Sequence, residues 1–278
     1  MRSWTLNNRG LDLRVLELSE ADGPPIVCLH GWLDQGAAWA PVAAGQPGRW
    51  LAMDQRGHGG SAHLGAGGYY HFPDYLADLD ALVRAVGAPV RLVGHSMGGT
   101  VAAMYAGARP DRVSALVAVE GLGALEVSER SMLARTRQHL DGLASPPPPL
   151  RVASVEAAAE RLVKRHDGLS AEHALLLAQH GTVADPRGYR WSFDPLHMTR
   201  APYPFREEAF AEFLAEITAP TLLIWGESGW YPTEIQRERA AHIRDVRHLT
   251  LPGGHMLPYS ASRALGEAIS GFLAEVGG

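Results

Sequence analysis

A serine between two glycines lies where a short apolar run gives way to a helical pattern. Gly94, Ser96 and Gly98 form a G-x-S-x-G pattern that follows the apolar run 90–93 and opens a helical pattern over 97–108. A sharp turn from strand to helix needs small residues here, because the backbone passes close to itself. Such a turn raises the hydroxyl near a helix N-terminus, whose N–H groups stabilise developing negative charge. Ser96 is therefore a candidate nucleophile; the alternative is a serine that only caps the helix.

A histidine near the C-terminus could serve this nucleophile as a general base. His255 follows the apolar run 247–251 through Pro252, Gly253 and Gly254. An imidazole ordinarily titrates near neutrality, so it can accept the serine proton and return it to a leaving group. Together the two residues predict acyl transfer through a covalent intermediate. The alternative is a solvated loop histidine.

Apolar runs that alternate with helical patterns predict the elements that position these residues. Apolar residues at three- and four-residue spacing indicate helices over 75–86 and 97–108, and another helix closes the chain. The alternation of apolar and polar residues over 11–18 indicates an edge strand in a hairpin with 3–7. Six short runs predict buried strands, at 26–29, 50–53, 90–93, 115–119, 221–225 and 247–251. The order is typical of the α/β class, with helices on both faces of a mostly parallel sheet.

The segment 121–218 interrupts this alternation. It is helical in pattern, rich in Ala, Arg, Glu and His, and broken by the proline run 146–149. Because proline cannot continue a helix, we expect this run to be a stiff polyproline bridge between two helices. We therefore expect a core domain formed by 1–120 and 219–278, with 121–218 inserted as a helical cap.

Composition narrows the class of protein and its partners. The 278 residues are 46% hydrophobic and 20% charged, an ordinary globular balance that suits one α/β domain with an insertion. A formal charge of −5 without a basic cluster argues against nucleic-acid binding, and no apolar run is long enough to cross a bilayer. Without an apolar leader, the chain is expected to be soluble and cytoplasmic, a monomer or homodimer that acts on a small molecule. A single cysteine, Cys28, excludes an internal disulfide.

Several glycine-containing motifs resemble, in order and spacing, those of the α/β-hydrolase fold family over nearly the whole chain. They are His30-Gly31-Trp32, Asp54-Gln55-Arg56-Gly57-His58-Gly59-Gly60-Ser61 and Gly94-His95-Ser96-Met97-Gly98-Gly99. With Glu120-Gly121-Leu122-Gly123 and Gly226-Glu227-Ser228-Gly229-Trp230, they are most similar to its serine hydrolase-like branch. The resemblance implies an eight-stranded, mostly parallel sheet with helices on both faces and an inserted helical cap.

The resemblance also implies roles for residues around the serine. The backbone N–H of Trp32, after His-Gly, and that of Met97, after the nucleophile, would form the oxyanion hole. His30 and His58 would shape loops and not bind a metal. We expect neither a metal nor a cofactor, because the glycines near Ser96 fit the turn and not a phosphate loop.

The carboxylate that would orient His255 is missing from its common place. The family commonly has an aspartate three residues after the glycine that ends strand 221–225, but this chain has Gly229 there. Glu120, at the end of strand 115–119, offers a carboxylate on the same edge of the sheet, and some family members carry the acid there. We expect Glu120 to be the triad acid; Glu227, or no functional acid, is the alternative.

Aromatic residues collect late in the inserted segment: Tyr189, Trp191, Phe193, Tyr203, Phe205, Phe210 and Phe213. Because caps of this family cover the substrate pocket, an apolar or aromatic substrate is expected, bound by Trp32, His95, Trp191 and Phe193. The alternative is that the aromatic residues only join cap to core. No basic cluster stands out in the segment, so simple esters are favoured over acyl-CoA or phosphorylated substrates.

The leading functional hypothesis is hydrolysis of a carboxylic ester through an acyl-enzyme. Ser96 would attack, His255 would carry the proton, Glu120 would orient it, and the N–H groups of Trp32 and Met97 would bind the oxyanion. The same scaffold also supports thioester hydrolysis, carbon–carbon bond hydrolysis and lyase chemistry. The non-enzymatic alternative is a small-molecule receptor. The reason to consider it is that the usual acid is missing at Gly229.

Overall fold

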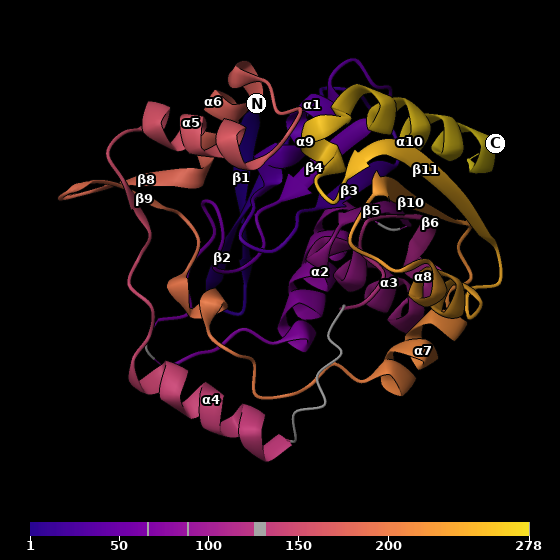
Figure 1. The fold of residues 1–278 in the computed structure, drawn as a ribbon. Helices are drawn as coiled ribbons and strands as arrows, with labels where there is room; N and C mark the ends of the chain where they lie inside the picture. The colour runs from indigo at the N-terminus through magenta and orange to yellow at the C-terminus, as the bar shows by residue number, and fades with distance from the viewer. Residues whose placement is uncertain (66, 88, 125–131, 278) are drawn as a thin grey trace.

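The computed structural model describes residues 1–65, 67–87, 89–124 and 132–277, and its centre is one eight-stranded sheet (Figure 1). The strands lie in the order β1-β2-β4-β3-β5-β6-β10-β11. Their bounds are Arg2–Asn8 (β1), Leu11–Glu17 (β2), Pro25–Leu29 (β3), Arg49–Met53 (β4), Val90–His95 (β5), Val113–Val119 (β6), Thr221–Ser228 (β10) and Val246–Gly254 (β11). β2 pairs antiparallel with β1 and β4, and all other neighbours are parallel. The predicted mostly parallel, eight-stranded sheet is confirmed.

The position of β2 differs from the expectation. The prediction that 11–18 forms an edge strand is wrong, because β2 pairs on both sides and β1 is the outer strand. Leu13 and Val15 are buried while Asp12 is exposed. The alternation therefore reports the two faces of the strand, which differ in burial wherever the strand lies in the sheet.

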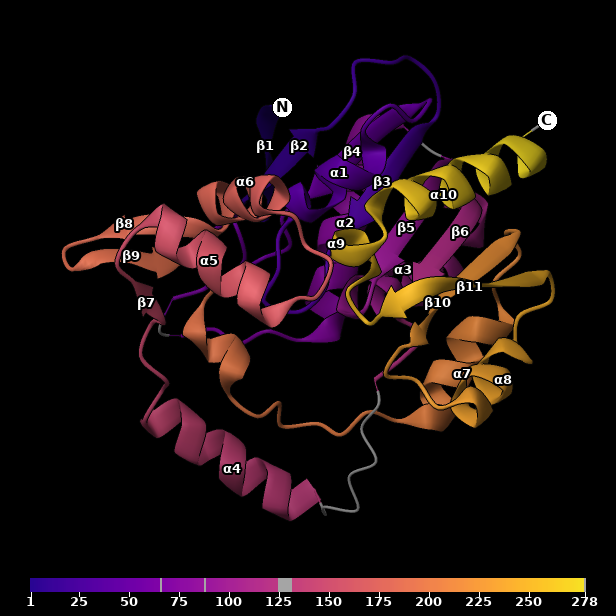
Figure 2. The same ribbon diagram turned by 45° about the horizontal axis from the view of Figure 1, so that its top comes forward.

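Helices cover both faces of the sheet, as expected (Figures 1 and 2). In β3, Val27 and Leu29 belong to the core cluster on one face, and Ile26 and Cys28 to the cluster on the other. α2, α3, α7 and α8 contribute to the first cluster, and η1, α1, α9 and α10 to the second. Their bounds are Gly36–Trp39 (η1), Ala40–Ala43 (α1), Phe72–Val86 (α2), Met97–Ala108 (α3), Glu207–Ala215 (α7), Thr233–Ala240 (α8), Leu257–Ser260 (α9) and Ser262–Val276 (α10), with a short 3-10 turn at Pro110–Arg112 (η2).

The inserted segment contains strands as well as helices. Its elements are Met132–Ala144 (α4), Arg151–Val152 (β7), Val155–Arg165 (α5), Ala171–Gly181 (α6), Thr182–Asp185 (β8), Gly188–Trp191 (β9) and Pro195–Met198 (η3). The three strands form a separate antiparallel sheet in the order β7-β9-β8, which a purely helical cap would not have. The proline run 146–149 leads from α4 to β7 and so does not join two helices.

The last helix of the segment packs against the core. Phe210 and Leu214 of α7 belong to the same hydrophobic cluster as Val101 and Tyr105 of α3. The part of the inserted segment that stands apart from the core layers therefore ends before α7 (Figure 2). This is earlier than position 218, the expected end of the cap. Within the described ranges, no helix combines the length and the apolar character needed to span a membrane.

Candidate active site

Ser96 lies in a strained turn between β5 and α3, as the G-x-S-x-G pattern predicted. Its φ is 52° and its ψ is −118°, a conformation that costs a non-glycine residue about 1–3 kcal/mol unless its surroundings hold it. A Cβ atom at Gly94 would overlap the carbonyl of Gly98, and one at Gly121 would overlap the backbone of Ser96. These glycines allow the ends of β5 and β6 to pack closely around the turn. The serine side chain remains only partly buried, so a substrate can reach it.

His255 connects Ser96 to Glu120. Its Nε2 lies 3.0 Å from Ser96 Oγ, and its Nδ1 lies 3.1 Å from Glu120 Oε2. In the tautomer with a proton on Nδ1, this N–H donates to the carboxylate and the serine hydroxyl donates to Nε2. Both His255 and Glu120 are buried. The structure thus brings together three residues that the sequence placed at separate strand ends, in a geometry suited to proton transfer from serine.

Glu120 is fully buried, and backbone donors as well as the imidazole hold its carboxylate. Oε1 accepts a hydrogen bond from the backbone N–H of Gly226 at 2.8 Å, and Oε2 accepts one from that of Trp230 at 3.2 Å. A Cβ atom at Gly229 would overlap this carboxylate. The glutamate from the neighbouring strand therefore fills the space that the missing side chain at position 229 leaves free. Glu227, the alternative acid, is exposed.

The loop after β3 lies against the serine turn. A Cβ atom at Gly31 would lie 3.3 Å from that of Ser96 and 3.0 Å from Nδ1 of His95. Among the described residues, none accepts a hydrogen bond from the backbone N–H of Trp32 or Met97. Two N–H groups beside the nucleophile without an internal acceptor are suited to bind an oxyanion.

His30 and His58 brace this loop. The backbone N–H of Gln55 donates to Nε2 of His30 at 3.0 Å, and that of Leu33 donates to Nε2 of His58 at 3.3 Å. Burial lowers the pKa of His30 to about 4, and burial followed by the charge of His30 lowers the pKa of His58. Both rings are therefore neutral near pH 7 and can accept these bonds. Leu33 has a positive φ of 60°, which such a brace can hold.

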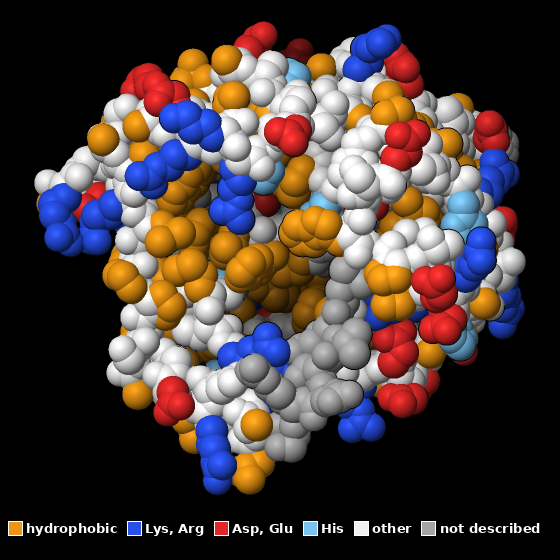
Figure 3. All heavy atoms as spheres, in the orientation of Figure 1, with side chains coloured by type: hydrophobic (Ala, Val, Ile, Leu, Met, Phe, Trp, Pro, Cys, Tyr) orange, Lys and Arg blue, Asp and Glu red, His pale blue; other side chains and the backbone are white. Residues whose placement is uncertain are grey.

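A cavity of about 420 Å³ extends from the serine turn toward the inserted segment. Trp32 and Met97 are among its lining residues, and Figure 3 shows a hollow walled mainly by hydrophobic side chains on this face of the molecule. Aromatic side chains form much of the remaining wall: Tyr69, Tyr70, Phe72, Tyr75, Tyr203, Phe205, Phe210 and Phe213. The volume lies within the range of small-molecule sites, and the lining suits an apolar or aromatic group.

Three arginines also line this cavity, which the sequence did not lead us to expect. Arg135 comes from α4, while Arg200 and Arg206 flank the stretch that leads to α7. Among the described residues, the lining includes no aspartate or glutamate. The basic residues are scattered over some 70 positions of the segment, and the fold gathers them. The wall of the cavity thus contains basic groups beside its apolar side chains.

The expected substrate-binding residues do not all reach this cavity. Trp32 lines it, but His95 is buried and its Nε2 donates to the carbonyl of His255 at 2.8 Å. Trp191 and Phe193 line a separate, smaller pocket. The cause is β9, whose pairing with β7 and β8 carries these two aromatic residues away from the larger cavity.

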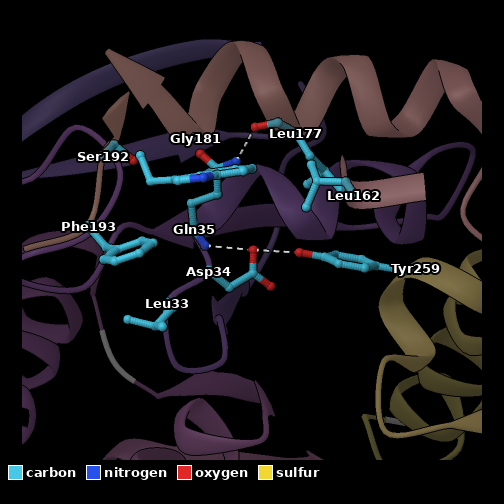
Figure 4. A pocket seen from close by; sticks show the side chains of 10 residues that line it. Leu33, Asp34, Gln35, Leu162, Leu177, Gly181, Ser192, Phe193 and Tyr259 are labelled. Carbon is cyan, nitrogen blue, oxygen red and sulfur yellow. Dashed lines mark hydrogen bonds between the residues drawn. The ribbon is translucent and has the colours of Figure 1, made fainter. Parts of the chain in front are cut away.

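The smaller pocket, of about 40 Å³, lies between the loop after β3, α6 and α9 (Figure 4). Oδ1 of Asp34 accepts hydrogen bonds from the Tyr259 hydroxyl and the Gln35 N–H, each at 2.8 Å, and Nε2 of Gln35 donates to the carbonyl of Leu177 at 2.6 Å. Among the described residues, Oδ2 of Asp34 and Oε1 of Gln35 have no partner. The space has room for about one or two water molecules. Burial raises the pKa of Asp34 to about 7.

Trp230 is a contact of the site that sequence reasoning missed. Its indole stacks on the imidazole of His255, with 3.7 Å between ring centroids and 3° between planes. No periodicity or motif predicts such a contact, because Trp230 lies in an irregular turn after β10. The one available signal was its place next to Gly229, where the family's acid is commonly found.

Comparison with known proteins agrees with this architecture. A sequence profile of the alpha/beta hydrolase fold matches residues 24–261, so the chain belongs to the α/β-hydrolase fold family, as the motifs implied. Serine hydrolase-like proteins are among its curated relatives, and the chain is a hydrolase of the α/β-hydrolase type.

Two relatives and one solved structure illustrate the similarity. Serine hydrolase-like protein 2 of Homo sapiens is 28% identical over 273 residues, which cover 90% of this chain and 87% of that protein. The serine hydrolase-like protein of Danio rerio is 28% identical over 232 residues, 80% of this chain and 71% of that one. The thioesterase domain from the curacin biosynthetic pathway is 32% identical, with a TM-score of 0.88, and covers 97% of this chain and 98% of that one. Such coverage extends the similarity to the inserted segment.

Proposed function

We propose that this hydrolase cleaves a carboxylic ester of a small apolar or aromatic substrate through an acyl-enzyme. The single observation that carries the proposal is the position of His255, whose two ring nitrogens face Ser96 Oγ and Glu120 Oε2 at once. A base in contact with both nucleophile and acid is the arrangement that covalent acyl transfer requires. The main argument for a non-catalytic receptor was the missing acid at Gly229. The carboxylate of Glu120 removes that argument.

In the first half-reaction, Ser96 Oγ attacks the acyl carbon while His255 Nε2 accepts the hydroxyl proton. The carbonyl oxygen becomes an oxyanion and accepts hydrogen bonds from the N–H groups of Trp32 and Met97. Collapse of the tetrahedral intermediate breaks the bond to the alkoxy oxygen, and the imidazolium returns its proton to the leaving alcohol. Glu120 keeps the Nδ1 proton in place and stabilises the imidazolium.

In the second half-reaction, water takes the place of the alcohol. His255 Nε2 accepts a proton from the water as its oxygen attacks the acyl carbon, and the same two N–H groups hold the new oxyanion. Collapse breaks the bond to Ser96 Oγ, which regains the proton from His255. The products are the carboxylic acid and the free enzyme.

Hydrolysis of p-nitrophenyl esters from short to long acyl chains tests the proposal. Wild type is expected to show turnover with an optimum chain length set by the 420 Å³ cavity. Ser96→Ala should fold normally and lose turnover by about 10³-fold or more. Turnover retained by a folded Ser96→Ala variant would exclude the mechanism.

A thioester is the second candidate substrate, because the chain is 32% identical to a thioesterase domain over nearly its whole length. The same serine, base and oxyanion hole serve an alkylthio leaving group. Matched oxygen and sulfur esters of one acyl group discriminate the two: a kcat/KM at least tenfold higher for the thioester would favour this second activity.

A further inference from the structure

Trp230 touches both the candidate base and the candidate acid. Its indole lies flat on the His255 imidazole, 3.7 Å between centroids and 3° between planes, and its backbone N–H donates to Oε2 of Glu120. That oxygen is the one that faces Nδ1 of His255. One residue thus fixes the carboxylate through its backbone and covers the imidazole with its side chain.

Core packing does not account for the position of this indole. The Trp230 side chain is 65% exposed, so it gains little of the burial that usually holds a tryptophan in place. The contact it makes is with the buried ring of His255.

We propose that Trp230 is a positioning residue, which holds the His255 imidazole in the plane where Nδ1 faces Glu120 and Nε2 faces Ser96. This inference rests on the proposed function, since it assigns a role within the same reaction. An aromatic face in van der Waals contact restricts rotation of the imidazole out of its plane but leaves both nitrogens accessible at the ring edge. The hydrogen bonds at the two nitrogens then act on a ring whose orientation is already set.

The restriction matters most after the serine is acylated. Ser96 Oγ then carries the acyl group and has no proton to donate to Nε2, so the ring loses one of its two side-chain hydrogen bonds. Glu120 still anchors Nδ1, but a single hydrogen bond lets the ring swing. The stack with Trp230 keeps Nε2 directed toward the site where water must attack.

Replacement of the indole by Leu and by Phe tests this role. Trp230→Leu keeps the backbone N–H to Glu120 but removes the flat face, and we expect kcat for a p-nitrophenyl ester to fall about 10- to 100-fold. KM should fall as well, because the acyl-enzyme accumulates when deacylation slows more than acylation. Trp230→Phe restores an aromatic face and should retain kcat within about threefold of wild type. A pre-steady-state burst of p-nitrophenol should be larger in Trp230→Leu than in wild type, because deacylation slows more than acylation.

Proton NMR of the imidazole N–H gives a readout that does not depend on turnover. The downfield resonance of Nδ1–H, assigned by its loss in His255→Ala, should be sharp in wild type and Trp230→Phe and broadened in Trp230→Leu. Leu175→Ala, at an exposed residue of α6, serves as control and should change neither measurement. Circular dichroism checks the fold of each variant.

Two results would overturn the proposal: an unchanged Nδ1–H resonance in Trp230→Leu, or a Trp230→Phe variant as impaired as Trp230→Leu. Failure of the proposed function is distinguishable, because a wild type without ester turnover would leave the NMR comparison intact. In that case a broadened signal would still show that the indole orders the ring.

Discussion

The carboxylate of Glu120 occupies the space that a side chain at position 229 would need. The two positions lie 109 residues apart in sequence, yet the parallel pairing of β6 with β10 brings their strand ends together. An acid at one position therefore excludes an acid at the other. This relationship explains why a chain with glycine at 229 still has a carboxylate beside His255.

Glu120→Gln should lower kcat by about 10²- to 10⁴-fold with little effect on KM. The amide has nearly the same shape but cannot balance the positive charge that His255 acquires when it takes the serine proton. Steady-state kinetics of ester hydrolysis measure the effect. Glu227→Gln, at an exposed glutamate near the end of β10, is the matched control and should keep wild-type rates; the opposite ranking would assign the acid to Glu227.

Moving the acid from one strand end to the other tests whether Glu120 and a side chain at position 229 occupy the same space. Gly229→Asp alone should destabilise the protein by about 3 kcal/mol or more, because a second carboxylate is forced against a buried one. Glu120→Gly combined with Gly229→Asp should recover at least about tenfold of the kcat lost in Glu120→Gly alone. Urea unfolding and ester kinetics of the three variants report both effects. A Gly229→Asp protein as stable as wild type would contradict the overlap.

Asp34 should make the protein less stable as the pH rises toward neutrality. Burial raises its pKa to about 7 in the folded state, while an unfolded carboxyl titrates near 3.9. The folded protein therefore binds this proton more tightly than the unfolded chain does. The contribution of Asp34 to the free energy of unfolding is thus complete below about pH 4 and is lost as the pH rises through about 7. The loss of stability has an upper bound of about 4 kcal/mol. The actual loss is smaller, because Asp34 is partly exposed.

Urea unfolding between pH 4.5 and 8 measures this dependence. Asp34→Asn should flatten it and be more stable than wild type at pH 8. Asp22→Asn, at an exposed aspartate, should leave the dependence unchanged. If Asp34→Asn followed the wild-type profile, another group would be responsible.

Arg206 should favour substrates with a negative charge at the end remote from the ester. It lines the larger cavity and is exposed, so its effect is moderate and screened by salt. For a p-nitrophenyl ester whose acyl chain ends in a carboxylate, Arg206→Gln should lower kcat/KM about 3- to 10-fold at low salt. The uncharged ester of equal length should be unaffected. Arg187→Gln, in the β8–β9 turn, is the charge-matched control; equal losses for both esters would rule out charge recognition.

The positions of the three candidate reacting groups were predictable because each one directly follows the end of a strand. Ser96, Glu120 and His255 come after β5, β6 and β11, and the carboxyl ends of parallel strands meet at one edge of a sheet. Strand periodicity and chain order indicated the shared edge, and the resemblance to the α/β-hydrolase fold family pointed to Glu120 in place of the missing acid. The glycines of the serine turn added the local geometry.

The walls of the cavities were not predictable in the same way. Trp191 and Phe193 were expected at the substrate, but the short sheet of β7, β8 and β9 directs them to the smaller pocket. Strands of two to four residues leave too little alternation to recognise. The stacking of Trp230 and the gathering of the arginines depend on the path of irregular segments, which no periodic pattern encodes.

The place of Glu120 at the end of β6 has a consequence for the evolution of the chain. The candidate nucleophile, the candidate acid and both candidate oxyanion donors all precede the inserted segment, and His255, the candidate base, follows it. Everything between α4 and η3 can therefore be exchanged as one contiguous block without moving a reacting atom. A chimera that receives this block from a relative should keep its own chemistry and most of its own cavity wall, which is formed mainly by residues before α4 and after η3.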